Sequence, residues 1–163
     1  LKLTPSGGRI VLIQNSDILQ CPNGLTSDDA GNLYAVTFAA GNVVRITPEG
    51  ELDVIAELPT LSGGPNPVGL GHITFGNGGL FVTAIGTGVI YRVGLDGSVS
   101  TLAGIPFAFS NIDGAADTAT FSKPNGIAIS ADGSRLFINV SEPTWPGDAQ
   151  GLHPAKLRMI SGF

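Results

Sequence analysis

The chain has 163 residues, a formal net charge of −5, 42% hydrophobic and 13% charged residues, 24 Gly and 11 Pro, a mixture typical of many short strands joined by tight turns. The acidity argues against nucleic-acid binding, and the single Cys argues against an intrachain disulfide framework and a zinc site. No apolar run approaches the roughly 20 residues of a membrane span. Leu1 is not a natural start, so a removed leader is compatible with the sequence, and a secreted or periplasmic location is slightly favoured.

The first 20 residues match a later part of the chain. Residues 1–7, Leu-Lys-Leu-Thr-Pro-Ser-Gly, correspond position by position to residues 44–50, Val-Arg-Ile-Thr-Pro-Glu-Gly. The later stretch is predicted to be the third strand of a four-stranded unit and the turn after it. We therefore expect residues 1–20 to be the end of such a unit, with Arg9 to Ile13 as its fourth strand.

Three further segments share one pattern of strands and turns. Each begins with two short strands joined by a turn rich in Gly, Asn and Asp, and continues with a strand that carries an Arg between apolar residues. The first strands are residues 22–25, 69–72 and 124–127, and the second strands are 33–36, 80–83 and 136–139. The third strands are 44–46, 91–93 and 157–159, and fourth strands are predicted at 52–55 and 99–102.

This repetition predicts the fold class. A four-stranded antiparallel unit that recurs after 47 residues (Leu33 to Leu80) and again after 56 (Leu80 to Leu136) is typical of the blades of an all-β propeller. A two-sheet sandwich would not require the same turns at the same places, and solenoid repeats are usually shorter. The predicted blade segments are residues 1–20 (the end of one blade), 21–56, 64–104 and 121–163 (an incomplete blade). With incomplete first and last units, we expect a partial ring whose terminal strands pair with another chain or with missing blades.

Two stretches resemble known propeller families. Residues 101–104 (Thr-Leu-Ala-Gly), 111–116 and 121–129 are similar to the linker between blades of the NHL repeat. Residues 123–133 also resemble the SMP-30, gluconolactonase and regucalcin group of six-bladed propellers. The resemblance implies a six-bladed ring, and in the gluconolactonase group an Asn of a Pro-Asn-Gly motif can ligate a divalent metal. Asn23 and Asn125 occupy that position here, and their oxygen ligands would suit Ca²⁺.

The lengths of the connections predict which face of the propeller binds. The turns between first and second strands and between third and fourth strands are all tight. The long segments, residues 59–67, 104–123 and 141–156, all fall on the opposite face. Because long loops on a rigid scaffold usually carry function, we expect binding there.

The candidate site residues near that face have both structural and functional interpretations. Asn23 and Asn125 either shape the turn into an inner strand or bind a ligand or metal. His72 is predicted to fill the position of Leu25 and Ile127, as a packing residue or as a titratable group. Asn139 begins a formal glycosylation motif. The remaining candidates, in a loop that Pro143 and Pro146 would stiffen, are Glu142, Trp145, Asp148 and His153.

Some residues are assigned structural roles. Asn111 and Asp113 are interpreted as turn formers, and the Ala-rich residues 113–121 permit a short helical turn. The third-strand arginines Arg45, Arg92 and Arg158 are expected on blade faces, with carboxylates such as Asp53 as neighbours across a strand pair.

No local catalytic motif occurs in the sequence. It has no nucleophile elbow, no His-Glu-x-x-His pair and no Gly-rich phosphate loop. The leading interpretation is therefore a propeller segment that binds a small polar ligand or a protein partner without catalysis and without a certain cofactor. The alternatives are part of a metal-dependent lactonase or esterase that uses Ca²⁺ or another divalent ion, and a lyase on the same scaffold.

Overall fold

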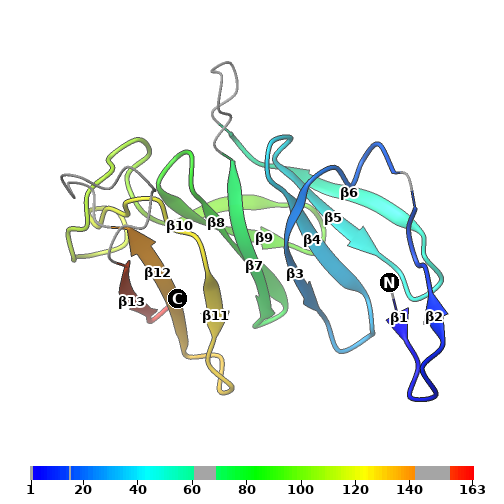
Figure 1. The fold of residues 1–163 in the computed structure, drawn as a ribbon. Helices are drawn as coiled ribbons and strands as arrows, with labels where there is room; N and C mark the ends of the chain where they lie inside the picture. The colour runs from blue at the N-terminus through cyan, green and yellow to red at the C-terminus, as the bar shows by residue number, and fades with distance from the viewer. Residues whose placement is uncertain (1, 15, 61–68, 142–154) are drawn as a thin grey trace.

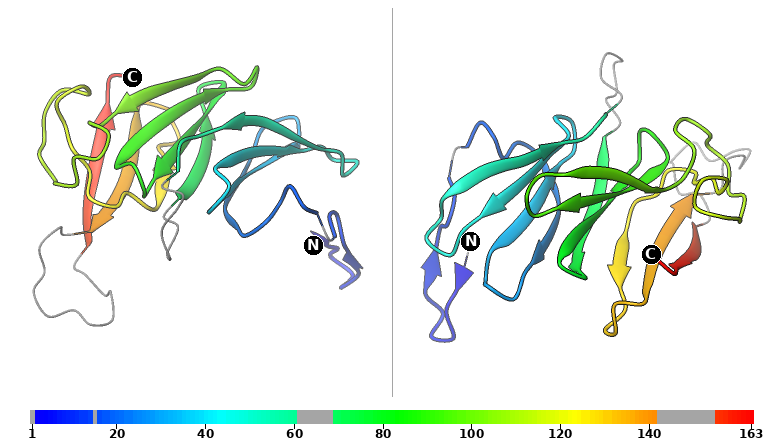
Figure 2. Two further views of the ribbon diagram at one scale, coloured as in Figure 1. Left: turned by 90° about the horizontal axis from the view of Figure 1, so that it is seen from above. Right: turned by 180° about the vertical axis from the view of Figure 1, so that it is seen from behind.

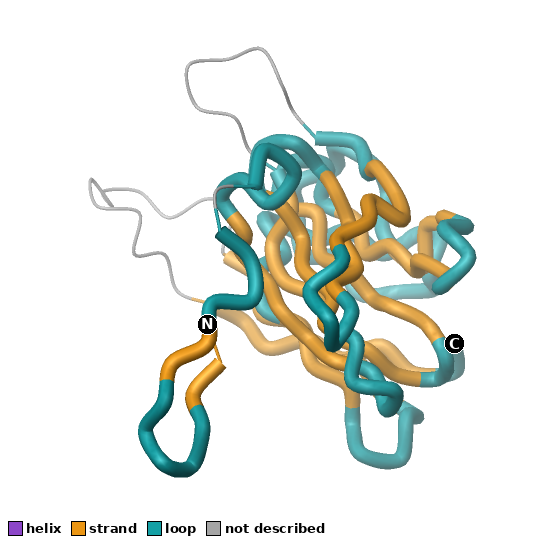
Figure 3. The backbone as a smooth tube through the Cα atoms, turned by 90° about the vertical axis from the view of Figure 1, so that its right-hand side faces the viewer, coloured by secondary structure: helices purple, strands orange, loops and turns teal. Residues whose placement is uncertain are grey.

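The computed structural model describes residues 2–14, 16–60, 69–141 and 155–163, and these form strands, turns and loops without a helix (Figure 1, Figure 3). The strands lie in four separate antiparallel sheets, which we name blades A to D. Blade A holds β1 (Lys2–Leu3) and β2 (Arg9–Ile10). Blade B holds β3 (Pro22–Ser27), β4 (Leu33–Thr37), β5 (Asn42–Ile46) and β6 (Leu52–Glu57). Blade C holds β7 (Leu70–Gly76), β8 (Gly79–Ala84), β9 (Val89–Gly94) and β10 (Val99–Ala103). Blade D holds β11 (Ile127–Ile129), β12 (Arg135–Ser141) and β13 (Ala155–Ser161).

Within each blade, consecutive strands are hydrogen-bonded neighbours, as the predicted hairpins require. Turn chemistry fixes these pairings. Asn77 and Gly78 both adopt positive φ (49° and 67°) between β7 and β8, the conformation that a two-residue hairpin turn needs to match strand twist. The blades stand side by side in an arc, and the ring is not closed within this chain (Figure 2).

Alternation along the strands builds two cores between the blades. In β4, Tyr34 and Val36 are buried against blade C, where Tyr34 stacks on Phe75 at 6.4 Å between ring centroids. In β8, Leu80 and Val82 belong to this first core, whereas the intervening Phe81 faces blade D. Both faces of blade C are therefore covered, because successive side chains of a strand point to opposite sides of the sheet. The second core between blades C and D is formed by Phe81, Ile90, Ala103, Ala119, Phe121, Leu136, Ile138 and Val140.

The innermost strands of blades B, C and D lie directly beside one another. Gly24 in β3 lies so close to β7 that a Cβ added there would sit 2.7 Å from the Cα of His72 and 2.7 Å from the nitrogen of Ile73. On the other side of β7, a Cβ on Gly71 would lie 2.7 Å from the carbonyl oxygen of Asn125. Glycine therefore allows the backbones to approach at both positions.

Candidate functional site

The inner strands of blades B, C and D begin at the same end of the blades. β3 and β7 begin there, Asn125 lies two residues before β11, and β12 ends there because it runs antiparallel to β11. This arrangement brings together Asn23, His72, Asn125 and Asn139, which we call the mouth cluster. All four residues are solvent-exposed. The structure thus places four of the predicted site residues at one end of neighbouring strands.

Hydrogen bonds to the middle inner strand position the two Pro-Asn-Gly asparagines. The side-chain amide of Asn23 donates to the carbonyl oxygen of Leu70 at 3.1 Å, which fixes the orientation of that amide. The backbone nitrogen of His72 donates to the carbonyl oxygen of Asn125 at 3.0 Å. Asn23 and Asn125 therefore flank the start of β7 from opposite sides.

His72 does not occupy the position that the sequence predicted. Leu25 pairs with Ala35, Ile127 pairs with Ile138, and the corresponding residue of blade C is Ile73, which pairs with Val82. The pairing shifts between Leu70 and Ile73, so β7 carries a bulge that contains His72. A bulge re-aims a side chain, and here the imidazole is exposed whereas Ile73 enters the first core.

The backbone around His72 is tightly held although its side chain is exposed. Besides its bond to Asn125, the backbone nitrogen of His72 donates to the hydroxyl oxygen of Thr83 in the neighbouring strand at 2.8 Å. The buried Thr83 hydroxyl in turn has one hydrogen to donate, and the carbonyl oxygen of Asn125 is the nearer of its two acceptors, with that of His72 at 3.3 Å. This hydroxyl, which the sequence did not single out, links blades C and D beneath the mouth cluster.

Asn139 has a structural partner. Its side-chain oxygen accepts a hydrogen bond from the nitrogen of Gly126, and its own nitrogen donates to the carbonyl oxygen of Gly126 at 3.2 Å. The side chain therefore supports the chain just before β11 and leaves its amide nitrogen as the group that can face a ligand. The other predicted site residues, Glu142, Trp145, Asp148 and His153, lie outside the described residues.

The mouth cluster offers amides and an imidazole but no carboxylate. Among the residues that the structure describes, no group of three or more His, Cys, Asp or Glu could hold a metal ion. Ca²⁺ usually takes six to eight oxygens with carboxylates among them, so Asn23 and Asn125 would need anionic ligands from elsewhere. The chemistry of the cluster as described is hydrogen bonding to a polar ligand.

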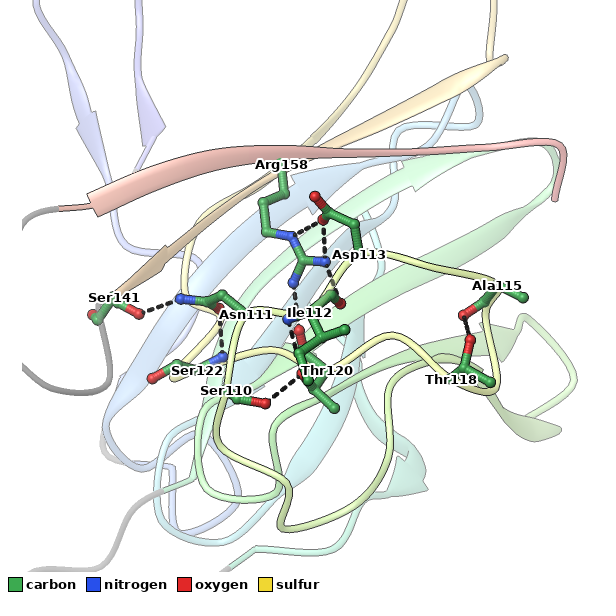
Figure 4. Close-up of polar contacts among 10 residues, drawn as sticks. All are labelled: Ser110, Asn111, Ile112, Asp113, Ala115, Thr118, Thr120, Ser122, Ser141 and Arg158. Atoms are coloured by element: carbon green, nitrogen blue, oxygen red, sulfur yellow. Dashed lines mark hydrogen bonds and ion pairs between the residues drawn. The ribbon is translucent and has the colours of Figure 1, made fainter.

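The connection between β10 and β11 is ordered by a second polar network (Figure 4). The side chain of Asn111 donates to the carbonyl oxygen of Ser141 at 2.8 Å and accepts from the nitrogen of Ser122 at 2.9 Å. The hydroxyl of Thr120 lies 2.7 Å from that of Ser110 and accepts from the nitrogen of Ile112 at 3.0 Å. Asn111 therefore ties the connection to the end of β12, which is more than the turn-forming role expected from the sequence.

Arg158 in β13 completes this network. Its guanidinium donates to the carbonyl oxygens of Ile112 and Thr120 and to Asp113, with a shortest distance of 2.6 Å to that carboxylate. It also lies over the ring of Phe121, 4.4 Å from the ring centroid. Residues 113–121, where the sequence permits a short helical turn, contain one hydrogen-bonded turn and no helix, with the nitrogen of Ala119 donating to the carbonyl oxygen of Ala115 at 2.8 Å.

The other two third-strand arginines lie on blade faces, as predicted. Arg45 pairs with Asp53 across β5 and β6 at 2.8 Å. The guanidinium of Arg92 lies 6.0 Å from the ring centroid of Phe81.

Comparison with known proteins identifies the fold of this chain. No protein-family profile matches the sequence, and no curated protein matches it. The solved structures of similar shape include the following three. A protein of unknown function from Bacteroides thetaiotaomicron has a TM-score of 0.62 at 23% identity over 74% of this chain and 30% of its own. Virginiamycin B lyase from Staphylococcus aureus has a TM-score of 0.59 at 20% identity over 98% of this chain and 47% of its own.

The third is a gluconolactonase from Xanthomonas campestris, with a TM-score of 0.57 at 14% identity over 85% of this chain and 43% of its own. The chain thus spans less than half the length of each of these structures. The similarity confirms the predicted fold, part of a β-propeller of four-stranded blades.

No helix long and apolar enough to cross a membrane occurs among the described residues.

Proposed function

We propose that this propeller segment is a binding scaffold that holds a small polar ligand at the mouth cluster, without catalysing a reaction. The observation that carries the proposal is the direct contact of β3, β7 and the chain before β11, which places Asn23, His72 and Asn125 beside one another, exposed and on fixed backbone. A site built on strands of a rigid scaffold needs little reorganisation to bind.

The chemistry of the cluster favours a ligand rich in hydroxyl groups. An amide offers both a donor and an acceptor, and an imidazole does the same when neutral. Such groups match the hydroxyls of a sugar or sugar acid. The nearby Thr83 hydroxyl and the Asn139 side-chain oxygen are engaged with backbone groups, so they support the site rather than contact the ligand.

The proposal is tested with glucose, gluconate and glucono-1,5-lactone as probes, by calorimetry and by the shift in melting temperature. We expect at least one probe to bind the wild-type protein, and Asn23→Ala, His72→Ala and Asn125→Ala to weaken that binding at least tenfold. Asn125→Ala should leave the fold intact, because the backbone of Asn125 and not its exposed side chain makes the interblade bond.

Asn77→Gly is the matched control. It removes an exposed amide at the opposite end of the blades, where that amide donates to the carbonyl oxygen of Gly133 at 2.9 Å, and glycine tolerates the positive φ of that position. Binding that is equally weakened by Asn77→Gly, or absent for all three probes, would remove the proposal.

The second candidate is part of a metal-dependent hydrolase, favoured by the equivalent positions of Asn23 and Asn125 on either side of β7. In this reading the two amide oxygens are metal ligands, and the carboxylates lie outside the described residues. Hydrolysis of glucono-1,5-lactone that depends on added Ca²⁺, Mn²⁺, Mg²⁺ or Zn²⁺, together with metal-induced thermal stabilisation that Asn125→Ala removes, would support it over simple binding. A melting temperature indifferent to millimolar amounts of all four ions would exclude it.

A further inference from the structure

The connection between β10 and β11 exposes a row of large apolar side chains. Ile105, Phe107, Phe109 and Ile112 are 41%, 57%, 41% and 60% exposed. We call these four residues the 105–112 ridge. The connection lies at the side of the arc farthest from the N-terminus (Figure 2). Neighbouring parts of the same connection bury Ala119 and Phe121 in the second core, so the exposure is a property of the ridge and not of the whole loop.

The backbone at Phe107 is in a conformation that disfavours a side chain. Ala108 donates to the carbonyl oxygen of Ile105 at 3.1 Å, which closes a turn with Pro106 second and Phe107 third. The φ of Phe107 is +64°. In a turn with Pro second and positive φ third, glycine is the favoured third residue. A phenylalanine there adopts an unfavourable conformation and is mostly exposed, so neither turn geometry nor core packing explains it.

The ridge is held in place from several sides. The nitrogen of Phe107 donates to the carbonyl oxygen of Thr87 at 2.8 Å in the loop between β8 and β9. Asn111 and Arg158 fix the distal half through Ser141 and Ile112 (Figure 4). Rigid aromatic side chains lose little conformational entropy on association, which is why they dominate the energetics of protein interfaces.

A hollow of about 370 Å³ adjoins the ridge, and its chemistry restricts the partner. Its lining residues are Thr101, Leu102, Gly104, Ile105, Pro106, Ala116 and Asp117. The hollow can admit an apolar side chain, and exposed Asp117 places a negative charge at its wall. β10, which supplies Thr101 and Leu102, is bonded within the described residues to β9 alone, so its outer edge is open to an added strand.

We propose that the 105–112 ridge and this hollow bind an extended segment of a partner protein that carries apolar residues and at least one Lys or Arg. The acidic wall and the net charge of −5 oppose an anionic membrane surface, and they equally oppose a second copy of this chain. A basic, apolar segment satisfies both the charge and the exposed aromatic rings. This surface is separate from the mouth cluster and does not depend on it.

A pair of substitutions separates backbone strain from recognition. Phe107→Gly relieves the unfavourable φ and removes the ring, whereas Phe107→Ala removes the ring and keeps the unfavourable φ. We expect Phe107→Gly to unfold at a higher urea concentration than Phe107→Ala, and both to lose partner binding to the same extent. Equal urea midpoints for the two variants would contradict the proposed strain.

Binding is measured with peptides selected on the wild-type protein from a random 12-residue display library, with Phe107→Gly protein for counter-selection. We expect apolar sequences with Lys or Arg, at least tenfold weaker affinity for Phe107→Ala and Ile112→Ser, and a threefold or greater loss in Asp117→Asn. His72→Ala, the control, should bind as wild type. The proposal is overturned by peptides without basic residues, by the absence of peptides that distinguish the variants, or by Phe107-dependent binding to phosphatidylserine vesicles or self-association in sedimentation.

Discussion

Removal of the Arg158 guanidinium is the perturbation whose cost the structure predicts best. The side chain is 11% exposed, and it donates to two backbone carbonyl oxygens, those of Ile112 and Thr120. Each charge-assisted bond of this kind contributes about 1.5 kcal/mol or more. The contact with the ring of Phe121 adds about 1 kcal/mol. We therefore expect Arg158→Ala to lower the free energy of unfolding by about 4 kcal/mol.

The ion pair with Asp113 should contribute little to this total. The Asp113 side chain is 91% exposed, and exposed ion pairs contribute about 0.2–1 kcal/mol. Asp113→Ala should therefore lower the free energy of unfolding by about 0.5 kcal/mol. Arg158→Lys should lower it by an amount between those of Asp113→Ala and Arg158→Ala, because lysine keeps the charge but cannot reach every acceptor.

Urea unfolding followed by circular dichroism measures these differences. With a slope of about 2 kcal/mol per molar urea, the midpoint should fall by about 2 M in Arg158→Ala and by about 0.25 M in Asp113→Ala. If Asp113→Ala is as destabilising as Arg158→Ala, the ion pair and not the backbone carbonyls is the important contact, and the reasoning is wrong.

Two further predictions follow from the inner strands and from the tight turns. Gly24→Ala and Gly71→Ala should each lower the free energy of unfolding in urea by about 2–3 kcal/mol, because the new methyl group would meet backbone of the next blade. Gly79→Ala is the control, since the nearest atom to its new methyl group is 3.4 Å away, and it should lower the free energy of unfolding by less than about 1 kcal/mol. Equal losses at the three sites would contradict the close approach. Hydrogen bonds from Ser130 and then Ser134 lower the pKa of Asp132 from 3.8 to about 2, so its contribution to stability is complete above pH 3.8 and disappears as the pH falls toward 2. Asp132→Ala should flatten the dependence of the urea midpoint on pH in this window, and an unchanged pH dependence would refute the assignment.

The strands and turns could be predicted because their causes are local. Alternating apolar residues and turn pairs such as Asn77-Gly78 specify pairing within a few residues, and the repetition of the pattern specified the blade. Each predicted strand overlaps a strand of the structure among the described residues. Two of them differ in extent, because the first strand of the last unit begins at Ile127 instead of residue 124, and the strand predicted from Arg9 to Ile13 ends at Ile10. Asp53 is the partner of Arg45 across β5 and β6, as expected for a carboxylate on a neighbouring strand.

The contacts that the sequence did not predict depend on distant residues. The bulge that moves His72 out of the Leu25 position lies where β7 packs closely between the chain at Gly24 and the chain at Asn125. Arg158 in β13 binds Asp113, which lies 45 residues earlier in the connection between β10 and β11. The exposure of Phe107 is equally invisible in a sequence, since an aromatic residue near Ala and Ile ordinarily indicates a core.

At the mouth cluster the backbone is packed and the side chains are exposed, which explains why the sequence determines the fold better than it determines the ligand. Gly24 and Gly71 are required by the close approach of the inner strands, and no larger residue fits without a shift. The adjacent Asn23, His72 and Asn125 are exposed, and of their side chains the amide of Asn23 donates to the next blade at Leu70. Packing therefore places little restriction on the identity of His72 and Asn125. The same scaffold can therefore present different chemistry at this position without loss of stability, as expected for a fold that hosts unrelated functions. If the proposed function is correct, the identity of these exposed residues, rather than the blades beneath them, determines what the mouth cluster binds.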